Sequence, residues 1–480
     1  MAEAVLAVDQ GTSATKAIVL AGGEVLAVAE VALRPRYGSG GAVEIDPQKL
    51  LDSVLQAGRS ALAQAAVPVA AVALANQGET VLAWDRRHGT ALSPAIVWQD
   101  RRAETVVADL HAHAELIAAR TGLVLDPYFS APKMAWLHRQ LATGPLDTAV
   151  ITTSDTWLLH QLTGAFVTDA ATASRSLLTD LRTGAWDDQL WTLFGLADQP
   201  RPEIVGCDTI VGSTNVFGGE VPVAGVIVDQ QAALLAQHCL HEGAAKCTFG
   251  TGAFLLANTG PLPCRSNNGL AASVAWRLRG RTSYCLDGQV YAAGSAVRWL
   301  QQVGIIDGPA QLDPLATASR RPALAVPALA GLAAPWWRAD ATASFRGLTL
   351  ASTAGDLVAG TLYGIAAQLA ELADAAARDL GRPLPSLRVD GGLTRSRFLM
   401  QACADLLQIP LEISDDPHVT ALGAAVTARL ALDRARDVAA AIPRAPSTTV
   451  EPGWSRDRAQ EYRAGWRAAA EKELAQHDQL

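Results

Sequence analysis

The chain has 480 residues, of which 50% are hydrophobic and 18% charged, a composition typical of a globular protein that is long enough for two cores. Its formal net charge of −8 argues against nucleic acid as a main partner, because phosphate backbones bind basic surfaces. The apolar stretch 324–337 contains prolines and a glycine and is too short for a bilayer, so we expect no membrane segment. Six cysteines without paired spacing favour reduced thiols in a cytoplasmic protein.

The N-terminal part of the chain predicts a β-meander followed by a helix and a further strand. The apolar runs are separated by a polar, glycine-containing turn and by a Gly-Gly turn. Asp46 and Pro47 supply an N-cap and a first-turn proline for a helix that reaches about residue 66. The expected strands are 4–8, 16–20, 25–31 and 69–75. Mixed strands and helices predict an α/β fold.

A related pattern recurs half a chain later, where the strand-like runs 245–249 and 254–258 flank a Gly-Thr-Gly turn. Two such hairpins suggest a duplicated architecture with one phosphate-binding turn in each half. The elements expected to complete the second half are a strand at 387–389, a helix at 396–407, a strand at 410–413 and a helix at 421–431.

An interruption of the apolar pattern at 237–244 predicts the domain boundary. We therefore expect an N-terminal domain over residues 1–238 and a C-terminal domain over residues 239–480. The charged segment 455–476 has a helical composition and predicts a peripheral C-terminal helix.

The chain contains neither a GxxxxGK[ST] phosphate loop nor a complete GxGxxG motif. A nucleotide would instead be held by backbone amides in the two Gly-Thr turns, because glycine allows the backbone to approach phosphate oxygens closely. Turns of this kind are more often merely turns, so each one alone is a weak signal.

Two aspartates follow apolar strands, where carboxylates of open α/β sheets point toward ligands. Asp9, beside the first turn, is either a Mg²⁺ ligand near a transferred phosphate or an acceptor for turn amides. Asp229 ends the run 226–228 and begins a helix. It is either a helix cap or a catalytic base that accepts the proton of a substrate hydroxyl.

These pieces, in this order, resemble the FGGY carbohydrate kinases, and among them the glycerol kinases. The resemblance extends from about residue 4 to about residue 432. The matching segments are 9–12 (DQGT), 76–80 (NQGET), 96–102 (IVWQDRR), 126–130 (DPYFS), 154–159 (SDTWLL), 168–169 (TD), 173–175 (ASR), 229–233 (DQQAA), 249–254 (FGTGAF), 258–260 (NTG), 331–337 (GLAAPWW), 389–392 (VDGG) and 420–425 (TALGAA).

The resemblance implies two ribonuclease-H/actin-like (ASKHA) lobes, with ATP and a polyol meeting in an interlobe cleft. It implies that Asp229 is the general base and that Asp9 serves Mg²⁺. The implied polyol-binding residues are Glu79, Trp98, Tyr128, Asp229, Gln230 and Phe254. The implied nucleotide-binding residues are Gly11, Thr12, Ser13, Lys16, Gly250, Thr251, Gly294, Arg298, Gly391, Gly392 and Ser396. The residues alone favour ordinary core aromatics over pocket residues for Trp98, Tyr128 and Phe254.

The chain departs from the glycerol kinase pattern at several of these positions. Gly78 stands where glycerol kinases carry an arginine that would donate to a substrate hydroxyl. Its absence leaves room for a larger substrate or for a donor from elsewhere in the chain. Lys16 replaces an arginine after the first turn, Arg298 replaces a glutamine, and Ser396 and Arg397 replace an Asn-Asn pair, so the nucleotide contacts differ in detail.

The leading hypothesis is transfer of the ATP γ-phosphate to a terminal hydroxyl of a small polyol, with glycerol first and a four- or five-carbon polyol or ketose second. The alternatives are an actin-like nucleotide switch and a catalytically weak family member that acts as a regulator. A switch needs no polyol pocket, and intact Asp9 and Asp229 speak against the regulator. The resemblance also implies a homo-oligomer, a dimer or a tetramer.

Overall fold

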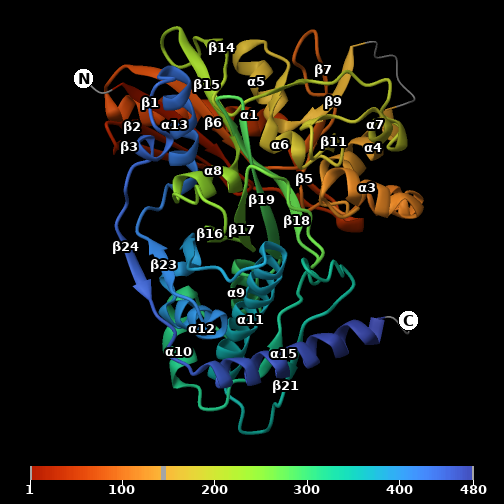
Figure 1. Ribbon diagram of the computed structural model, residues 1–480, viewed down its shortest axis with the longest axis vertical. Helices are drawn as coiled ribbons and strands as arrows, with labels where there is room; N and C mark the ends of the chain where they lie inside the picture. The colour runs from red at the N-terminus through yellow and green to blue at the C-terminus, as the bar shows by residue number, and fades with distance from the viewer. Residues whose placement is uncertain (1–2, 142–147, 478–480) are drawn as a thin grey trace.

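The structure, a computed structural model, describes residues 3–141 and 148–477 and divides into two lobes, one above the other in Figure 1. The first lobe contains a six-stranded sheet. In spatial order its strands are β14 (Ile210–Thr214), β15 (Val221–Val228), β6 (Val69–Asn76), β1 (Ala4–Gln10), β2 (Ala14–Ala21) and β3 (Glu24–Ala32). β1, β2 and β3 form an antiparallel meander, and β1, β6 and β15 run parallel. The predicted meander and the predicted fourth strand are confirmed.

Buried side chains of β1 alternate between the two faces of this sheet, as expected for a strand covered on both sides. Leu6 and Val8 belong to the core beneath α1 (Pro47–Ala65), whereas Val5 and Ala7 pack with α13 (Val419–Leu432). α1 begins after Asp46, whose carboxylate accepts a hydrogen bond from the backbone amide of Gln48, so the predicted N-cap is confirmed.

The second lobe repeats this plan around a seven-stranded sheet. In spatial order its strands are β18 (Ala271–Leu278), β19 (Arg281–Val290), β17 (Ala253–Gly260), β16 (Ala245–Phe249), β22 (Leu387–Asp390), β23 (Leu411–Ser414) and β24 (Ser447–Val450). β16 is antiparallel to β17 and parallel to β22, as β1 is to β2 and β6. The predicted α/β fold with two related lobes is confirmed.

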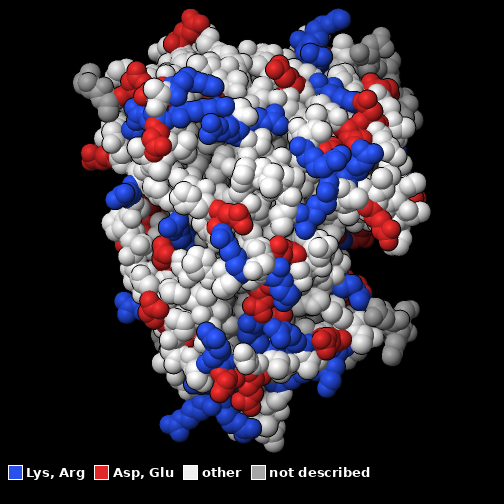
Figure 2. Space-filling view, in the orientation of Figure 1, with Lys and Arg blue, Asp and Glu red and all other residues white. Residues whose placement is uncertain are grey.

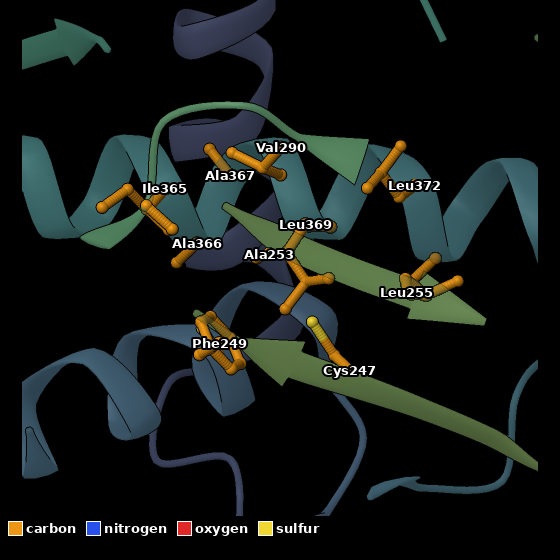
Figure 3. Packing of buried hydrophobic residues seen from close by; sticks show 14 of the residues in the cluster. Cys247, Phe249, Ala253, Leu255, Val290, Ile365, Ala366, Ala367, Leu369 and Leu372 are labelled. Carbon is orange, nitrogen blue, oxygen red and sulfur yellow. The ribbon is translucent and has the colours of Figure 1, made fainter. Parts of the chain in front are cut away.

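The core of the second lobe lies between this sheet and α11 (Ala354–Leu380), the longest helix described. Figure 3 shows Phe249 and Leu255 of the sheet packed with Ile365 and Leu369 of the helix. A capping box at Thr353 starts α11, since the threonine and Asp356 side chains each accept a hydrogen bond from the other's backbone amide.

The sequence predicted that the helix at 421–431 completes the second lobe. The structure shows instead that this helix, α13, belongs with the first lobe. It packs on the first-lobe sheet and against α8 (Asp229–Ala236), and Figure 1 shows it, in blue, beside the red strands of that sheet. The helices approach closely because Gly423 has no side chain: a Cβ there would lie 2.0 Å from the carbonyl oxygen of Ala232. The chain thus returns to the first lobe after building the second.

The C-terminal helix α15 (Arg456–His477) is present as predicted, but it is more than peripheral. Trp466 is fully buried within the second-lobe core, and its indole donates to the carbonyl of Ala325 at 2.9 Å. Arg463 pairs with Glu371 and Asp374 of α11. This helix therefore contributes to the core.

The remaining elements surround the two sheets. A five-stranded sheet beside the first lobe consists of β4 (Arg36–Tyr37), β5 (Val43–Ile45), β8 (Ala95–Ile96), β7 (Val81–Asp85) and β9 (Ala149–Thr153). Further helices are α2 (Glu104–Asp109), α3 (Ala114–Thr121), α4 (Ser130–Leu141), α5 (Ser154–Thr163), α6 (Ala170–Ser174), α7 (Asp188–Leu193), α9 (Gly294–Gln302), α10 (Leu312–Ala318), α12 (Arg397–Leu407) and α14 (Val438–Ala441). Short strand pairs are formed by β10 (Val167–Asp169) with β13 (Glu203–Val205), β11 (Thr179–Asp180) with β12 (Ala185–Trp186), and β20 (Leu324–Val326) with β21 (Ser344–Arg346).

Lys and Arg side chains are interspersed with Asp and Glu on the face drawn in Figure 2. Among the helices of residues 3–141 and 148–477, none combines the length and the apolar character that a bilayer crossing requires. All six cysteines are free thiols, as predicted.

Candidate active site

A cavity of about 780 Å³ lies between the lobes and is lined by residues of both. The first lobe contributes the turn after β1, the loop after β6 and the start of α8. The second contributes the β16–β17 turn and α9. The predicted site residues that line it are Thr12, Ser13, Glu79, Trp98, Tyr128, Asp229, Gln230, Gly250, Thr251, Phe254 and Arg298. The predicted polyol-binding residues therefore share one cavity with both Gly-Thr turns.

Some predicted residues lie outside the lining: Asp9, Gly11, Lys16, Gly294, Gly391, Gly392 and Ser396. A smaller cavity, of about 360 Å³, is lined by the end of α8, by β22 and β23 and by residues 443–447. It contains none of the predicted residues, so we assign the chemistry to the larger cavity.

Asp229 is the first residue of α8 and directly follows the buried strand β15. Val228 occupies the N-cap position, and the Asp229 carboxylate accepts a hydrogen bond from the next backbone amide, that of Gln230, at 2.7 Å. Burial raises the pKa of Asp229 above its ordinary value. The side chain thus presents a carboxylate of increased basicity to the cavity.

The three aromatic residues form an edge-to-face cluster that lines the cavity and also packs against the hydrophobic cores. The Trp98 ring centroid lies 5.7 Å from that of Tyr128 and 5.9 Å from that of Phe254. Its indole donates to the Thr12 hydroxyl at 2.9 Å, which in turn donates to the Gln77 side chain at 2.8 Å. Trp98 therefore connects the aromatic wall to the first Gly-Thr turn.

The second Gly-Thr turn is supported by a close approach of α9. The Gly294 amide donates to the carbonyl of Gly250 at 3.1 Å, and a Cβ at residue 294 would lie 2.5 Å from that oxygen. Gly391 has a φ of 98°, and a Cβ there would lie 2.3 Å from the carbonyl of Phe249. Both glycines shape the backbone around the turn, whether or not they contact a ligand.

Two predicted nucleotide-binding side chains are already engaged elsewhere. Ser396 caps α12, accepting from the Leu399 amide and donating to Asp313. The Lys16 ammonium donates to the carbonyl of Pro417 at 3.3 Å, just before α13.

Asp9 suits a magnesium site in which the protein supplies few ligands. Within residues 3–141 and 148–477 its carboxylate has no hydrogen-bond partner, and burial, with Asp229 nearby, raises its pKa to about 7. The same part of the chain contains no group of three or more His, Cys, Asp or Glu side chains arranged to hold a metal. Mg²⁺ commonly takes one or two carboxylates together with substrate phosphates and waters, so Asp9 alone fits that donor set.

Two buried cations near the site received no role from the sequence. The Lys246 ammonium donates to the Gln230 side chain at 2.6 Å and to the Thr248 hydroxyl at 2.9 Å, and burial lowers its pKa. Arg175, at the end of α6, lines the cavity. A charged lysine within the strand-like run 245–249 was the available signal for Lys246. Arg175 was visible only as part of the matched segment 173–175.

Comparison with known proteins agrees with this geometry. Residues 4–236 match the N-terminal domain, and residues 245–432 the C-terminal domain, of the FGGY family of carbohydrate kinases. The chain is 40% identical to a glycerol kinase of Thermus brockianus over 489 residues, 96% of this chain and 98% of the relative. It is also 40% identical to a glycerol kinase of Alkalilimnicola ehrlichii, with 98% of each chain covered.

Solved structures give the same result. The Plasmodium falciparum glycerol kinase with ADP superposes with a TM-score of 0.89 at 31% identity, with 98% of both chains covered. A ligand-bound xylulose kinase from Lactobacillus acidophilus superposes with a TM-score of 0.87 at 21% identity, a likeness of fold alone. The chain belongs to the FGGY family of carbohydrate kinases, as a phosphotransferase of the glycerol-kinase-like type.

Proposed function

We propose that this kinase transfers the γ-phosphoryl group of Mg-ATP to a terminal hydroxyl of a small polyol, with glycerol as the first candidate acceptor. The main support is that one interlobe cavity is lined by Asp229, by the predicted polar and aromatic polyol-binding residues and by both Gly-Thr turns. Carboxylates and amides bind the hydroxyls of a polyol, and aromatic rings cover its carbon edge.

The acceptor chemistry follows from the position of Asp229. Its carboxylate accepts the proton of the acceptor hydroxyl while that oxygen forms a bond to the γ-phosphorus and the bond to the β,γ-bridging oxygen breaks, releasing ADP. The Lys246 ammonium donates to the side-chain oxygen of Gln230 and so orients the Gln230 side chain beside Asp229. Positioning and proton acceptance are most of what a loose phosphoryl-transfer transition state requires.

The donor side of the proposal rests on the two turns and on Asp9. Gly250 and Thr251 from one lobe and Thr12 and Ser13 from the other would hold the phosphates through backbone amides and hydroxyls. Mg²⁺, held through Asp9, would neutralise charge on the transferred phosphate. ATP as the donor is supported by membership of the kinase family and by the ADP bound to the Plasmodium falciparum relative.

A longer acceptor is the second candidate, because Gly78 lines the cavity where glycerol kinases have an arginine. The proposal is tested by ADP release with Mg-ATP against glycerol, tetritols, pentitols and the corresponding ketoses. Highest kcat/KM on glycerol supports the first candidate, and highest kcat/KM on a longer polyol or ketose supports the second. ADP release that no acceptor stimulates would reject the kinase proposal in favour of a nucleotide switch.

Asp229→Asn tests the proposed base in the same assay. We expect turnover to fall by about two to four orders of magnitude, the usual effect of losing a general base. Mg-ATP binding measured by calorimetry should persist, since the amide is nearly isosteric. Near-normal turnover in this variant would remove Asp229 from the role of base.

A further inference from the structure

Another arginine of the same chain lies near Gly78. A Cβ at residue 78 would meet Val228 Cγ2 at 3.0 Å, and the next nearest atoms are Arg175 Nε at 3.9 Å and Cδ at 4.0 Å. Arg175 therefore lies in contact range of residue 78, at the wall of the same cavity.

Arg175 reaches this place from the end of α6 and is only 4% exposed. Its Nε donates to Glu79 Oε1, Nη1 donates to Asp287 Oδ2 at 2.6 Å, and Nη2 lies 3.4 Å from the Tyr128 hydroxyl. A guanidinium has five N–H donors, so two remain after these contacts. Arg175 and Tyr128 both line the cavity, so the guanidinium borders the acceptor pocket.

Glu79 needs such a partner. It has a φ of 58°, in the left-handed region that is unfavourable for a non-glycine residue, and its side chain is almost fully buried. An ion pair with Arg175 fixes its carboxylate in one orientation. Arg175 therefore orients Glu79, a predicted polyol-binding residue, and also has N–H donors of its own.

Asp287 makes this arrangement depend on both lobes. It lies on β19 of the second lobe, whereas Arg175 and Glu79 belong to the first. Its other oxygen, Oδ1, is buried and has no hydrogen-bond partner among the described residues, so the guanidinium is held by one oxygen of this carboxylate.

We propose that Arg175 is a specificity-determining guanidinium of the acceptor pocket, with Asp287 as its positioning residue. It orients Glu79 and donates to an acceptor hydroxyl, so that two neighbouring hydroxyls of the acceptor bind one carboxylate and one guanidinium. This inference rests on the proposed function and selects acceptors with two neighbouring hydroxyls.

The test compares Arg175→Lys and Arg175→Ala with the wild type on the best acceptor of the panel, measuring KM for the acceptor and for ATP separately. Loss of a hydrogen bond to a charged group costs about 1.5–3 kcal/mol, so we expect the acceptor KM to rise about 10- to 100-fold. The KM for ATP should change by less than about threefold, a change below 0.7 kcal/mol.

Arg463→Lys is the matched control, because Arg463 also pairs with two carboxylates but lies on α15, away from the cavity. Its acceptor KM should equal that of the wild type. If circular dichroism shows that the Arg175 variants do not fold, Asp287→Asn tests the proposal instead. This substitution keeps the shape of the Asp287 side chain and removes the negative charge that holds the Arg175 guanidinium. We expect a severalfold rise in acceptor KM without a rise in the KM for ATP.

Equal changes in both KM values, or an unchanged acceptor KM, would overturn the role of Arg175. These results are distinct from failure of the proposed function, in which the wild-type protein itself would show no acceptor-dependent ADP release.

Discussion

Lys133 is a buried cation that holds the loop carrying Tyr128. Its ammonium donates to the backbone carbonyls of Pro127, Tyr128 and Phe129 at 2.6–2.8 Å. Burial lowers its pKa to about 7, whereas three acceptors, each requiring an N–H, favour the charged form. The loop therefore depends on one side chain for three of its hydrogen bonds.

Lys133→Met should leave those carbonyls buried and unpaired. We expect the free energy of unfolding in urea to fall by about 2–5 kcal/mol, the cost of such orphaned groups, and the acceptor KM to rise because Tyr128 moves. The matched control is Lys49→Met on the exposed face of α1, which should change the free energy of unfolding by less than about 0.5 kcal/mol. Equal stability of the two variants would contradict this role.

At the residue scale, the sequence singled out side chains that follow strands, such as Asp9 and Asp229, because their surroundings are local, whereas Glu79 came only from the family resemblance. It assigned no role to Arg175. That side chain's partners, Glu79 and Asp287, lie 96 and 112 residues away in the sequence, and Asp287 meets it only when the lobes pack. Long-range partners of this kind leave no local pattern, so the charged network of the pocket required the structure.

At the scale of elements, α6 presents Arg175 and is capped by Asp169. The Asp169 carboxylate accepts hydrogen bonds from the backbone amides of Ala171 and Thr172, and burial raises its pKa to about 7. The native state thus keeps a proton that the unfolded chain releases near pH 4. Stability contributed by this group is present at low pH and is lost as the pH rises toward 7.

Asp169→Asn should remove this pH dependence while keeping an acceptor at the cap. The variant's free energy of unfolding minus that of the wild type should increase by about 2–3 kcal/mol between pH 5 and pH 7.5, at about 1.4 kcal/mol for each pKa unit. Urea unfolding at several pH values measures it, and taking the difference cancels the other carboxylates. A difference that stays constant or falls with pH would contradict a raised pKa.

The contact between α8 and α13 gives a second prediction for elements. Gly423→Ala would place a methyl group against the Ala232 carbonyl, pushing away the helix that begins with Asp229. We expect destabilisation of about 1–3 kcal/mol from overpacking, together with a lower kcat. The control is Gly465→Ala on α15, where a Cβ meets nothing within 4 Å. Helix propensity should make that variant about 0.5–1 kcal/mol more stable.

Helix α13 also marks the limit of prediction for elements. Its existence followed from a long apolar segment, but its position did not, because consecutive elements usually lie together and this one returns to the first lobe. The surface that α13 covers is selected by the close approach at Gly423, which is a tertiary property.

At the scale of the whole molecule, the acceptor pocket is complete only while both lobes contribute. The Arg175–Asp287 ion pair and the Trp98–Phe254 contact both join the first lobe to the second. Closing the lobes over both substrates would strengthen these contacts, exclude water and so limit hydrolysis of ATP without an acceptor.

Small-angle X-ray scattering can measure this closure as a decrease in the radius of gyration. We expect the largest decrease with a non-hydrolysable Mg-ATP analogue and the acceptor together, and a smaller one with either alone, because each ligand contacts only part of the cavity. A nucleotide switch would respond fully to the analogue and not to a polyol, since a ligand shifts an equilibrium only through its differential affinity for the two states. An identical radius of gyration for the ligand-free protein, for each ligand alone and for both together would contradict closure. It would mean that the cavity is already formed for both substrates.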